Sequence, residues 1–345
     1  MPPSRRVSIE DPSQCAEARR AALRLASQVG FDEARAGQVA IVVMEAATNI
    51  LKHAGRGEIL LQVTDPGSCD GSPDLELLSL DKGPGMRDLE QCLRDGYTTG
   101  TSPGQGLGAI RRLADESDFY SVPGEGTAIL ARWPLQPRQP LAEARRITLG
   151  EPRLRIGVVN VSKHGEEFCG DSWGVEQSRG SATVLVADGL GHGYEASQAS
   201  LEAVRVLRDH PDQTPASLID LAHRALRSLR GAAVSVARLD LMHGKMTFSG
   251  LGNVAAQIYA GAGRSQHLVS VHGTAGHQAA RIREFSYSWP ADGILVMHSD
   301  GLATAAGLDA RPALALRDPS LIAGVLYKDF SRGHDDATVV VARAA

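Results

Sequence analysis

Apolar residues recur with a helical period in two stretches near the start of the chain. From Cys15 to Val29, alanine, leucine and valine return every three or four residues, which predicts an amphipathic helix. A second helix is expected from about Asp32 to Ala54, because Asp32 suits the N-cap and Gly55 suits the C-terminal end. Strands are then expected at 58–63, 75–80 and 127–133, with a short helix at about 107–116.

The pattern changes after a proline-rich stretch. Residues 134–140 contain three prolines in seven positions and show no periodicity, which is typical of a linker. Beyond it, two helices at 194–207 and 216–229 lie among short β-rich segments, a pattern that favours two packed sheets flanked by helices. These segments are 154–161, 182–187, 232–239, 246–249, 258–260, 294–298 and 337–342. We therefore predict a first domain at 1–134, a linker at 135–147 and a second domain at 148–345.

Composition narrows the class of protein. A chain of 345 residues has room for two domains that each bury a core. The formal net charge of −4 argues against general nucleic-acid binding, which needs a strongly basic face. We find no apolar run long enough to cross a bilayer and no apolar core of a secretory signal, and four scattered cysteines suit a reducing compartment. We expect a cytoplasmic protein without nucleic-acid or membrane partners.

Polar residues form a stripe on the second predicted helix. Glu45, Asn49 and His53 are spaced four residues apart, and neighbouring apolar residues such as Ile41 and Val42 can pack the opposite face. A carboxylate and an amide are costly to bury unless they bind something, and Mg²⁺ held by the amide oxygen and nucleotide phosphates is one use. A solvent-facing polar stripe would give the same pattern, so this helix alone leaves both interpretations open.

Three further motifs follow in order along the chain. Asp81, at a strand end before Gly83 and Gly85, can accept a hydrogen bond from the amine of adenine while the glycines let the backbone approach it. A glycine-rich run then opens a helix, where free N–H groups favour phosphate, and Thr127 can reach the adenine side. The glycines of that run are Gly104, Gly106 and Gly108. Each motif alone is weak evidence, but their common order favours a nucleotide site.

These residues resemble a known family. The run Glu45-Ala-Ala-Thr-Asn49-Ile-Leu-Lys-His53-Ala resembles the N-box of the GHKL ATPases, in particular the anti-sigma-factor serine kinases of the stressosome switch type. The resemblance spans about residues 10–133 and implies a Bergerat-type α/β ATP-binding sandwich with a short lid at 97–104. It implies that Glu45 is the general base, that Asn49 binds Mg²⁺, and that further residues contact ATP. Those further residues are His53, Asp81, Gly83, Gly85, Thr99, Gly104, Gly106, Gly108 and Thr127.

The second half of the chain carries aspartates beside its β-rich segments. Asp171, Asp188, Asp300 and Asp335 each lie near a strand edge. One Asp-Gly pair is usually only a turn, but several carboxylates on one rim repel unless cations neutralise them. Carboxylate ligands suit Mg²⁺ or Mn²⁺ rather than zinc, and two such ions can activate a water and hold a phosphate for in-line attack.

These motifs are similar to those of the SpoIIE-like type 2C protein phosphatases of the stressosome feedback type, over about residues 148–345. The resemblance implies an α-β-β-α sandwich, so the expected class is a two-domain α+β and α/β protein. It implies that the four aspartates bind metal, that Asp188 is central to catalysis, and that Gly189 contributes its carbonyl. Asp336 lies where the superfamily often has asparagine, and His192 is either a proton donor or a turn residue.

Together the two resemblances imply a bifunctional regulator of a partner-switching pathway. The first domain would use Mg·ATP to phosphorylate a serine or threonine on a STAS-domain antagonist or sigma-factor regulator. The second would remove such a phosphate with Mn²⁺ or Mg²⁺, using two ions. Alternatively, the first domain only binds ATP and a partner without phosphoryl transfer. A homodimer is compatible with the resemblance.

Overall fold

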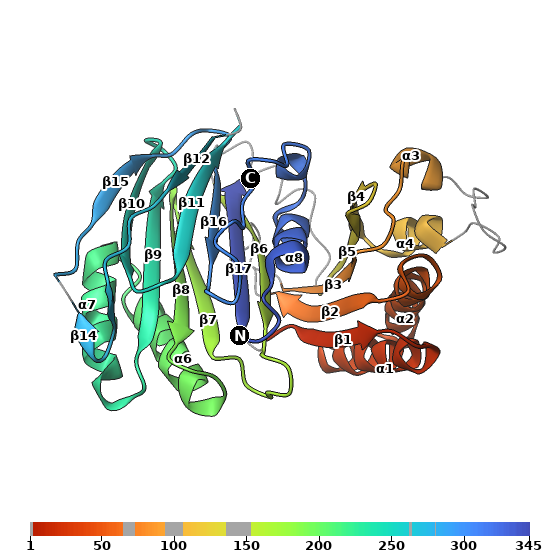
Figure 1. Cartoon of the computed structure of the whole chain (residues 1–345), viewed down its shortest axis with the longest axis horizontal. Coiled ribbons are helices and arrows are strands. Elements are labelled where there is room, and N and C mark those ends of the chain that lie inside the picture. The colour runs from red at the N-terminus through yellow and green to blue at the C-terminus, as the bar shows by residue number, and fades with distance from the viewer. Residues whose placement is uncertain (1–2, 65–72, 94–105, 136–152, 262–263, 280) are drawn as a thin grey trace. The chain divides into compact units, whose positions relative to one another are not determined.

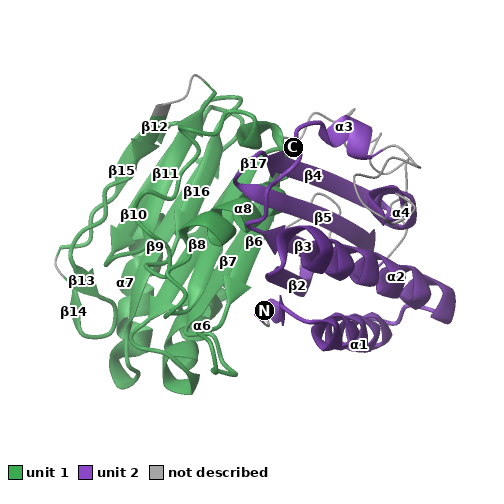
Figure 2. Ribbon diagram, turned by 45° about the vertical axis from the view of Figure 1, so that its right-hand side comes forward, with its two compact units in different colours: residues 1, 67–69, 140–345 green, residues 2–66, 70–139 purple. Residues whose placement is uncertain are grey.

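The chain folds into two compact units. The computed structural model describes residues 3–64, 73–93, 106–135, 153–261, 264–279 and 281–345. One unit comprises residues 2–66 and 70–139, and the other is built on residues 140–345 (Figure 2). Residues 136–147 of the predicted linker lie outside the described residues. Among the helices that are described, none is both long and apolar enough to cross a membrane.

The first unit is an antiparallel sheet with helices packed on one face (Figure 1). The strand order is β1-β2-β3-β5-β4, and the strands are β1 (Arg5–Ile9), β2 (Gly57–Thr64), β3 (Asp74–Asp81), β4 (Glu116–Val122) and β5 (Gly126–Pro134). The helices are α1 (Pro12–Gln28), α2 (Glu33–Asn49), α3 (Leu89–Cys92) and α4 (Gly106–Leu113). Alternate residues of the strands, such as Ile59 and Leu61, join apolar residues of α1, α2 and α4 in one core.

The predicted second helix has the expected ends but not a uniform geometry. Asp32 caps α2 by accepting a hydrogen bond from the Arg35 N–H at 2.7 Å, and Gly55 ends the helical run at a φ of 76°. Its last turn, Ile50–Ala54, is a π-helix. The prediction that Ile41 packs inward is wrong, because Ile41 lies one turn before Glu45 and is 49% exposed.

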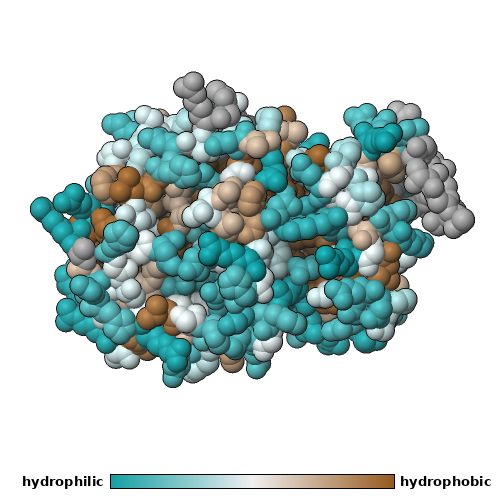
Figure 3. Space-filling model, in the orientation of Figure 1, coloured by the Kyte–Doolittle hydropathy of each residue, from teal (hydrophilic) through white to brown (hydrophobic). Residues whose placement is uncertain are grey.

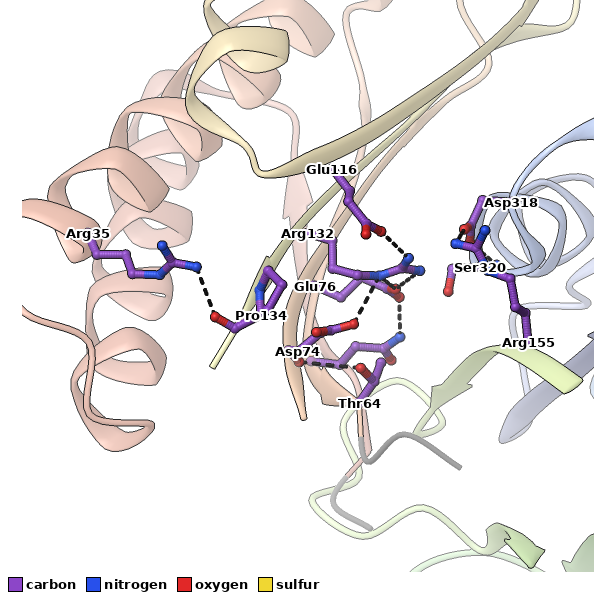
Figure 4. Close-up of polar contacts among 11 residues, drawn as sticks. Arg35, Thr64, Asp74, Glu76, Glu116, Arg132, Pro134, Arg155, Asp318 and Ser320 are labelled. Atoms are coloured by element: carbon purple, nitrogen blue, oxygen red, sulfur yellow. Dashed lines mark hydrogen bonds and ion pairs between the residues drawn. The ribbon is translucent and has the colours of Figure 1, made fainter. Parts of the chain in front are cut away.

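A buried ionic row fixes the register of four strands in this unit (Figure 4). Arg132 on β5 contacts Glu76 on β3 at 2.8 Å and Glu116 on β4 at 3.0 Å. Gln62 on β2 donates to Glu76 at 2.7 Å. These residues are direct ladder partners, so sliding any strand would separate them. Removing one partner of such a buried ion pair typically costs about 3–5 kcal/mol.

The second unit has two stacked antiparallel sheets. The first has the strand order β15-β10-β9-β8-β7 and the second the order β12-β11-β16-β17-β6. The strands of the first are β7 (Asp171–Ser178), β8 (Ser181–Gly189), β9 (Ala232–Asp240), β10 (Lys245–Leu251) and β15 (Phe285–Ser288). Those of the second are β6 (Leu154–Val161), β11 (Ala255–Ala260), β12 (Arg264–His267), β16 (Ile294–His298) and β17 (Ala337–Ala344). A small hairpin joins β13 (Gly273–Thr274) to β14 (Gln278–Ala279).

Helices complete the four layers of this unit. α6 (Tyr194–Asp209) and α7 (Pro215–Ala225) pack on the first sheet, and α8 (Pro319–Phe330) packs on β6 and β17 of the second (Figure 1). One apolar core lies between the sheets, and another lies between the first sheet and the helices α6 and α7. The expected α-β-β-α sandwich is therefore present.

Candidate functional site

Glu45 and Asn49 face the start of α4 in the first unit. A methyl group built on Gly106 would lie 3.0 Å from Glu45 Oε2 and 3.3 Å from Asn49 Oδ1, so both side chains lie close against the backbone of Gly106. Asn49 Nδ2 is buried and finds no hydrogen-bond partner among the described residues. A carboxylate and an amide therefore lie against the first described turn of α4, and the first N–H groups of a helix are generally free to bind an anion.

The other residues predicted to contact ATP in this region are not all placed beside Glu45, Asn49 and Gly106. His53 lies in the π-helical turn and is exposed, because a π-helical turn contains more residues than an α-helical turn and shifts the predicted stripe. Gly108 is buried in the first turns of α4. Thr99, Gly104 and the expected lid at 97–104 lie outside the described residues.

A second polar group forms around Asp81 at the end of β3. Asp81 Oδ1 accepts hydrogen bonds from the N–H groups of Gly83 at 2.8 Å and Thr127 at 3.2 Å. The Thr127 hydroxyl is 3.1 Å from that of Ser121, which also accepts the Met86 N–H at 2.9 Å. The predicted Asp81, Gly83 and Thr127 are thus brought together. Ser121 was missed because its strand, β4, was not predicted.

Gly85 gives a stability prediction for this turn. Its φ is 66°, and a methyl group on it would lie 2.1 Å from the Val122 carbonyl oxygen. We expect Gly85→Ala to lower the free energy of unfolding by about 3 kcal/mol, from backbone strain plus overpacking. Gly124→Ala is the matched control, since Gly124 has a φ of 83° and open space around it. It should lose only about 1–2 kcal/mol in urea unfolding, and equal losses would contradict the packing argument.

In the second unit the four predicted aspartates come from adjacent strand ends. Asp171 and Asp188 are direct partners in the β7–β8 ladder. In the other sheet β16 and β17 are neighbours, with Asp300 two residues after β16 and Asp335 two residues before β17. The charges of Asp171, Asp300 and Asp335 all raise the pKa of Asp188, so the carboxylates are near one another. We call this group the acidic cluster.

Burial makes two members of the acidic cluster, Asp171 and Asp188, hard to keep charged. Burial, with the nearby carboxylates adding to it, raises the pKa of Asp188 to about 9. Burial likewise raises the pKa of Asp171 to about 7, although the nearby Ser299 hydroxyl opposes the shift. Oδ2 of both residues is buried without a hydrogen-bond partner among the described residues. Such a site takes up either protons or cations, and oxygen donors suit Mg²⁺ or Mn²⁺.

The acidic cluster is open rather than a closed cage. In the described part of the chain, no three His, Cys, Asp or Glu side chains are gathered closely enough to form a metal site by themselves. The carboxylates nevertheless raise one another's pKa, so they lie near one another without forming a closed cage. An ion such as Mg²⁺ takes only one or two carboxylates, with backbone carbonyls and water supplying other ligands. The residues therefore fit a divalent ion that keeps much of its water.

The structure adds Asp336 to this region. Asp336 is buried, its Oδ1 accepts the Lys163 N–H at 2.8 Å, and its Oδ2 would lie 2.7 Å from a methyl group on Gly170. Its charge raises the pKa of Asp171. The Asp336 N–H in turn donates to Asp335 Oδ1 at 3.0 Å. Asp336 thus connects the β6–β7 loop to the acidic cluster, which its sequence position alone did not indicate.

Gly189 is the last residue of β8, and His192 lies on the loop that follows. The Gly189 N–H donates to the Gly170 carbonyl at 3.1 Å, and a methyl group on Gly189 would lie 2.2 Å from the Ala196 carbonyl oxygen. His192 is exposed, with Nδ1 2.7 Å from Glu166 Oε1. The glycine is therefore required by close packing beside the acidic cluster, and Glu166 orients the imidazole.

The raised pKa values predict how the metal-free protein responds to pH. Unfolded aspartates ionise near pH 3.8, whereas folded Asp171 and Asp188 keep their protons up to about pH 7 and about pH 9. Their contribution to stability is therefore greatest at low pH and is lost as pH rises through these values. In EDTA, the melting temperature should fall between pH 5 and 9, and Mn²⁺ should reduce the fall. A melting temperature that rises over this range without metal would contradict the account.

Comparison with known proteins agrees with this two-unit architecture. Residues 10–133 match the model of the histidine kinase-like ATPase domain, and residues 178–345 match that of stage II sporulation protein E. The chain thus combines a GHKL-type ATPase domain with a domain of the type 2C phosphatase fold, and its N-terminal part belongs to the histidine kinase-like ATPase family.

Particular relatives of both halves are known from Bacillus subtilis (strain 168). The chain is 36% identical to the serine/threonine-protein kinase RsbT over 118 residues, which are 34% of this chain and 86% of RsbT. It is 23% identical to the phosphoserine phosphatase RsbX over 145 residues, which are 42% of this chain and 73% of RsbX. The two halves are therefore similar to a kinase and a phosphatase of partner-switching, stressosome-type regulation.

Two solved structures have a fold similar to that of about half of this chain. A protein from work on the bacterial stressosome and its adaptation to secondary messenger signalling is 27% identical, with a TM-score of 0.52 over 55% of this chain and 100% of its own. RsbX in complex with magnesium is 21% identical, with a TM-score of 0.51 over 56% of this chain and 96% of its own.

Proposed function

We propose that the chain is a bifunctional regulator, with a phosphoprotein phosphatase in the second unit and a protein serine/threonine kinase in the first. The observation that carries the phosphatase half is the acidic cluster, where adjacent strand ends hold several buried or half-buried carboxylates together. The similarity of this chain to a phosphoserine phosphatase supports the same chemistry. The substrate is a phosphoserine or phosphothreonine on a protein.

In this proposal Asp171, Asp188, Asp300 and Asp335, with the Gly189 carbonyl, hold two Mn²⁺ or Mg²⁺ ions. When bound, such ions supply an activated water and orient the phosphate. Asp188 is central because its pKa responds to the other three carboxylates. The hydrogen bond that His192 Nδ1 makes to the Glu166 carboxylate fixes the imidazole ring beside the site, where His192 can serve as proton donor to the leaving serine oxygen.

The kinase half uses the residues gathered around Gly106. Glu45 is the general base that takes the proton of the partner's hydroxyl, and Asn49 holds Mg²⁺ on the nucleotide phosphates. The first turn of α4 contributes donors to the phosphates, and Asp81 with Thr127 forms the adenine end. His53, Gly83, Gly85, Thr99, Gly104 and Gly108 complete the proposed ATP contacts.

The partner is a STAS-domain antagonist or a related regulator of a sigma factor, which the similarity to proteins of a partner-switching pathway supports. The setting is cytoplasmic, and a homodimer is compatible with it. A kinase and a phosphatase acting freely on one serine would only consume ATP. We therefore expect different target sites for the two halves, or control by a partner or by the nucleotide.

The contacts around Asp81 and Thr127 would serve equally in a domain that binds ATP and a partner without phosphoryl transfer. One experiment separates the two functions. The purified chain is incubated with radiolabelled ATP and candidate STAS proteins, while equilibrium dialysis measures ATP binding. Label on a STAS serine or threonine supports the kinase. Bound ATP without label on any candidate would leave only the binding module.

A further inference from the structure

Exposed apolar side chains border the acidic cluster. Phe168, Leu190 and Tyr194 are 41%, 55% and 58% exposed, and the rings of Phe168 and Tyr194 meet edge to face with centroids 5.3 Å apart. We call these three residues the apolar rim. On the face drawn in Figure 3, hydrophobic residues form small groups among hydrophilic ones. Grouped apolar side chains in water indicate a binding surface more strongly than single ones do.

Close packing holds the apolar rim beside the acidic cluster. Phe168 lies just before Gly170, and a methyl group on Gly170 would lie 3.3 Å from the Gly191 carbonyl oxygen and 2.7 Å from Asp336 Oδ2. The loop that carries Leu190 is therefore directly against the loop that carries Phe168. The bond between Glu166 and His192 links the same two loops at 2.7 Å. The apolar rim is thus a built part of the site's border.

We propose that the apolar rim docks the polypeptide on either side of the phosphoserine, so that the phosphatase selects phosphoserines with apolar neighbours. This inference rests on the proposed phosphatase function. A phosphate held at the acidic cluster brings the chain that carries it across the adjoining surface, and that surface presents three large apolar groups. A small phosphate ester reaches the acidic cluster without touching them.

Two phosphoserine peptides of equal length and charge test this, one with leucine and one with serine at the positions around the phosphoserine. We expect the wild type to favour the leucine peptide roughly tenfold in kcat/KM, since partial burial of a leucine accounts for that ratio. The double variant Phe168→Ala, Tyr194→Ala should lose this preference and keep its hydrolysis of p-nitrophenyl phosphate. Met242→Ala, which removes an exposed apolar side chain in the β9–β10 turn, is the matched control.

The outcomes are distinct. Equal rates for both peptides, or an unchanged preference in the double variant, would overturn the docking role while leaving the phosphatase in place. A parallel loss of p-nitrophenyl phosphate hydrolysis would also overturn it, because the aromatic pair would then support the loops rather than the substrate. A wild type that hydrolyses none of the three compounds would refute the proposed function itself.

A separate observation concerns Asn253, on another border of the acidic cluster. Its Nδ2 donates to Asp300 Oδ2 at 2.7 Å, and the two residues face each other just beyond the β11–β16 ladder, where Ala255 pairs with His298. A methyl group on Gly252 would lie 2.5 Å from Cβ of Ala233, the ladder partner of Asp188. The Gly252-Asn253 turn therefore contacts the strand beside Asp188 and bonds to Asp300.

We infer that Asn253 is a positioning residue that fixes the Asp300 carboxylate for metal binding, again resting on the proposed function. Calorimetric titration with Mn²⁺ should show affinity for Asn253→Ala about tenfold weaker or more, as for other outer partners of metal ligands. Its melting temperature in EDTA should equal that of the wild type. Ser265→Ala is the matched control. Ser265 lies on β12, and the substitution removes its 2.6 Å hydrogen bond to another aspartate, Asp309.

Unchanged Mn²⁺ affinity in Asn253→Ala would overturn the positioning role. An equal loss of affinity in Ser265→Ala would also overturn the positioning role. So would a lower melting temperature of Asn253→Ala in EDTA, because Asn253 would then stabilise the fold rather than position Asp300. A wild type that binds no Mn²⁺ would instead refute the metal assignment on which the inference rests.

Discussion

Replacing Asp188 by asparagine is expected to abolish Mn²⁺-dependent hydrolysis of p-nitrophenyl phosphate and to stabilise the metal-free protein. Metal ions contribute several kcal/mol to such reactions, so we expect a loss of roughly 10³-fold or more in rate. Asparagine also removes a carboxylate that burial and three neighbouring charges make costly, which is why its pKa is raised to about 9. The melting temperature in EDTA at pH 8 should rise by roughly 2–4 °C per kcal/mol recovered.

The two effects together are diagnostic. A variant that loses activity because it unfolds would melt at a lower temperature, not a higher one. Asp309→Asn is the matched control, because Asp309 is exposed and bonds to Ser265 rather than to the acidic cluster. Full activity in Asp188→Asn, or a lower melting temperature without metal, would be incompatible with a metal site at this position.

Replacing Glu45 by glutamine is expected to stop phosphoryl transfer to the partner while ATP still binds. General bases contribute roughly 10²–10⁴-fold, so transfer should fall by about that factor. Glutamine keeps the shape of the side chain against Gly106, where Glu45 Oε2 would lie 3.0 Å from an added methyl group. ATP affinity, measured by equilibrium dialysis, should therefore change little.

Glu33→Gln serves as the control for this variant, because Glu33 lies in the exposed first turn of the same helix. It should leave both transfer and binding unchanged. If Glu45→Gln still regulates its partner as the wild type does, the first unit acts by binding alone and the kinase assignment is wrong. If both transfer and ATP binding disappear, Glu45 supports the fold rather than the reaction.

Local sequence signals predicted much of the first unit. The cap at Asp32 and the glycine at 55 located the ends of a helical run because capping and left-handed termination depend on neighbouring residues only. The π-helical turn at 50–54 was not predictable, since nothing in the local pattern distinguishes it from an α-helical turn. The exposure of Ile41 was likewise missed, because it depends on which side of α2 the sheet covers.

In the second unit the strand ends were easier to predict than the loops between them. Asp188 lies at the end of the strongly apolar β8, and Asp300 follows the strongly apolar β16, so their proximity was foreseeable from pattern and chemistry. The strand β7 and the helix α8 were not expected, because β7 mixes polar and apolar residues and α8 is buried on all sides. The burial of Asp336 depends on how the β6–β7 loop closes over it, which is a long-range property.

The central claim is that the acidic cluster binds divalent metal. Crystals of the whole chain grown with MnCl₂ and measured at the manganese absorption edge test it most directly. The account predicts anomalous density bounded by Asp171, Asp188, Asp300 and Asp335. Manganese bound elsewhere, with no anomalous density among these four carboxylates, would contradict it.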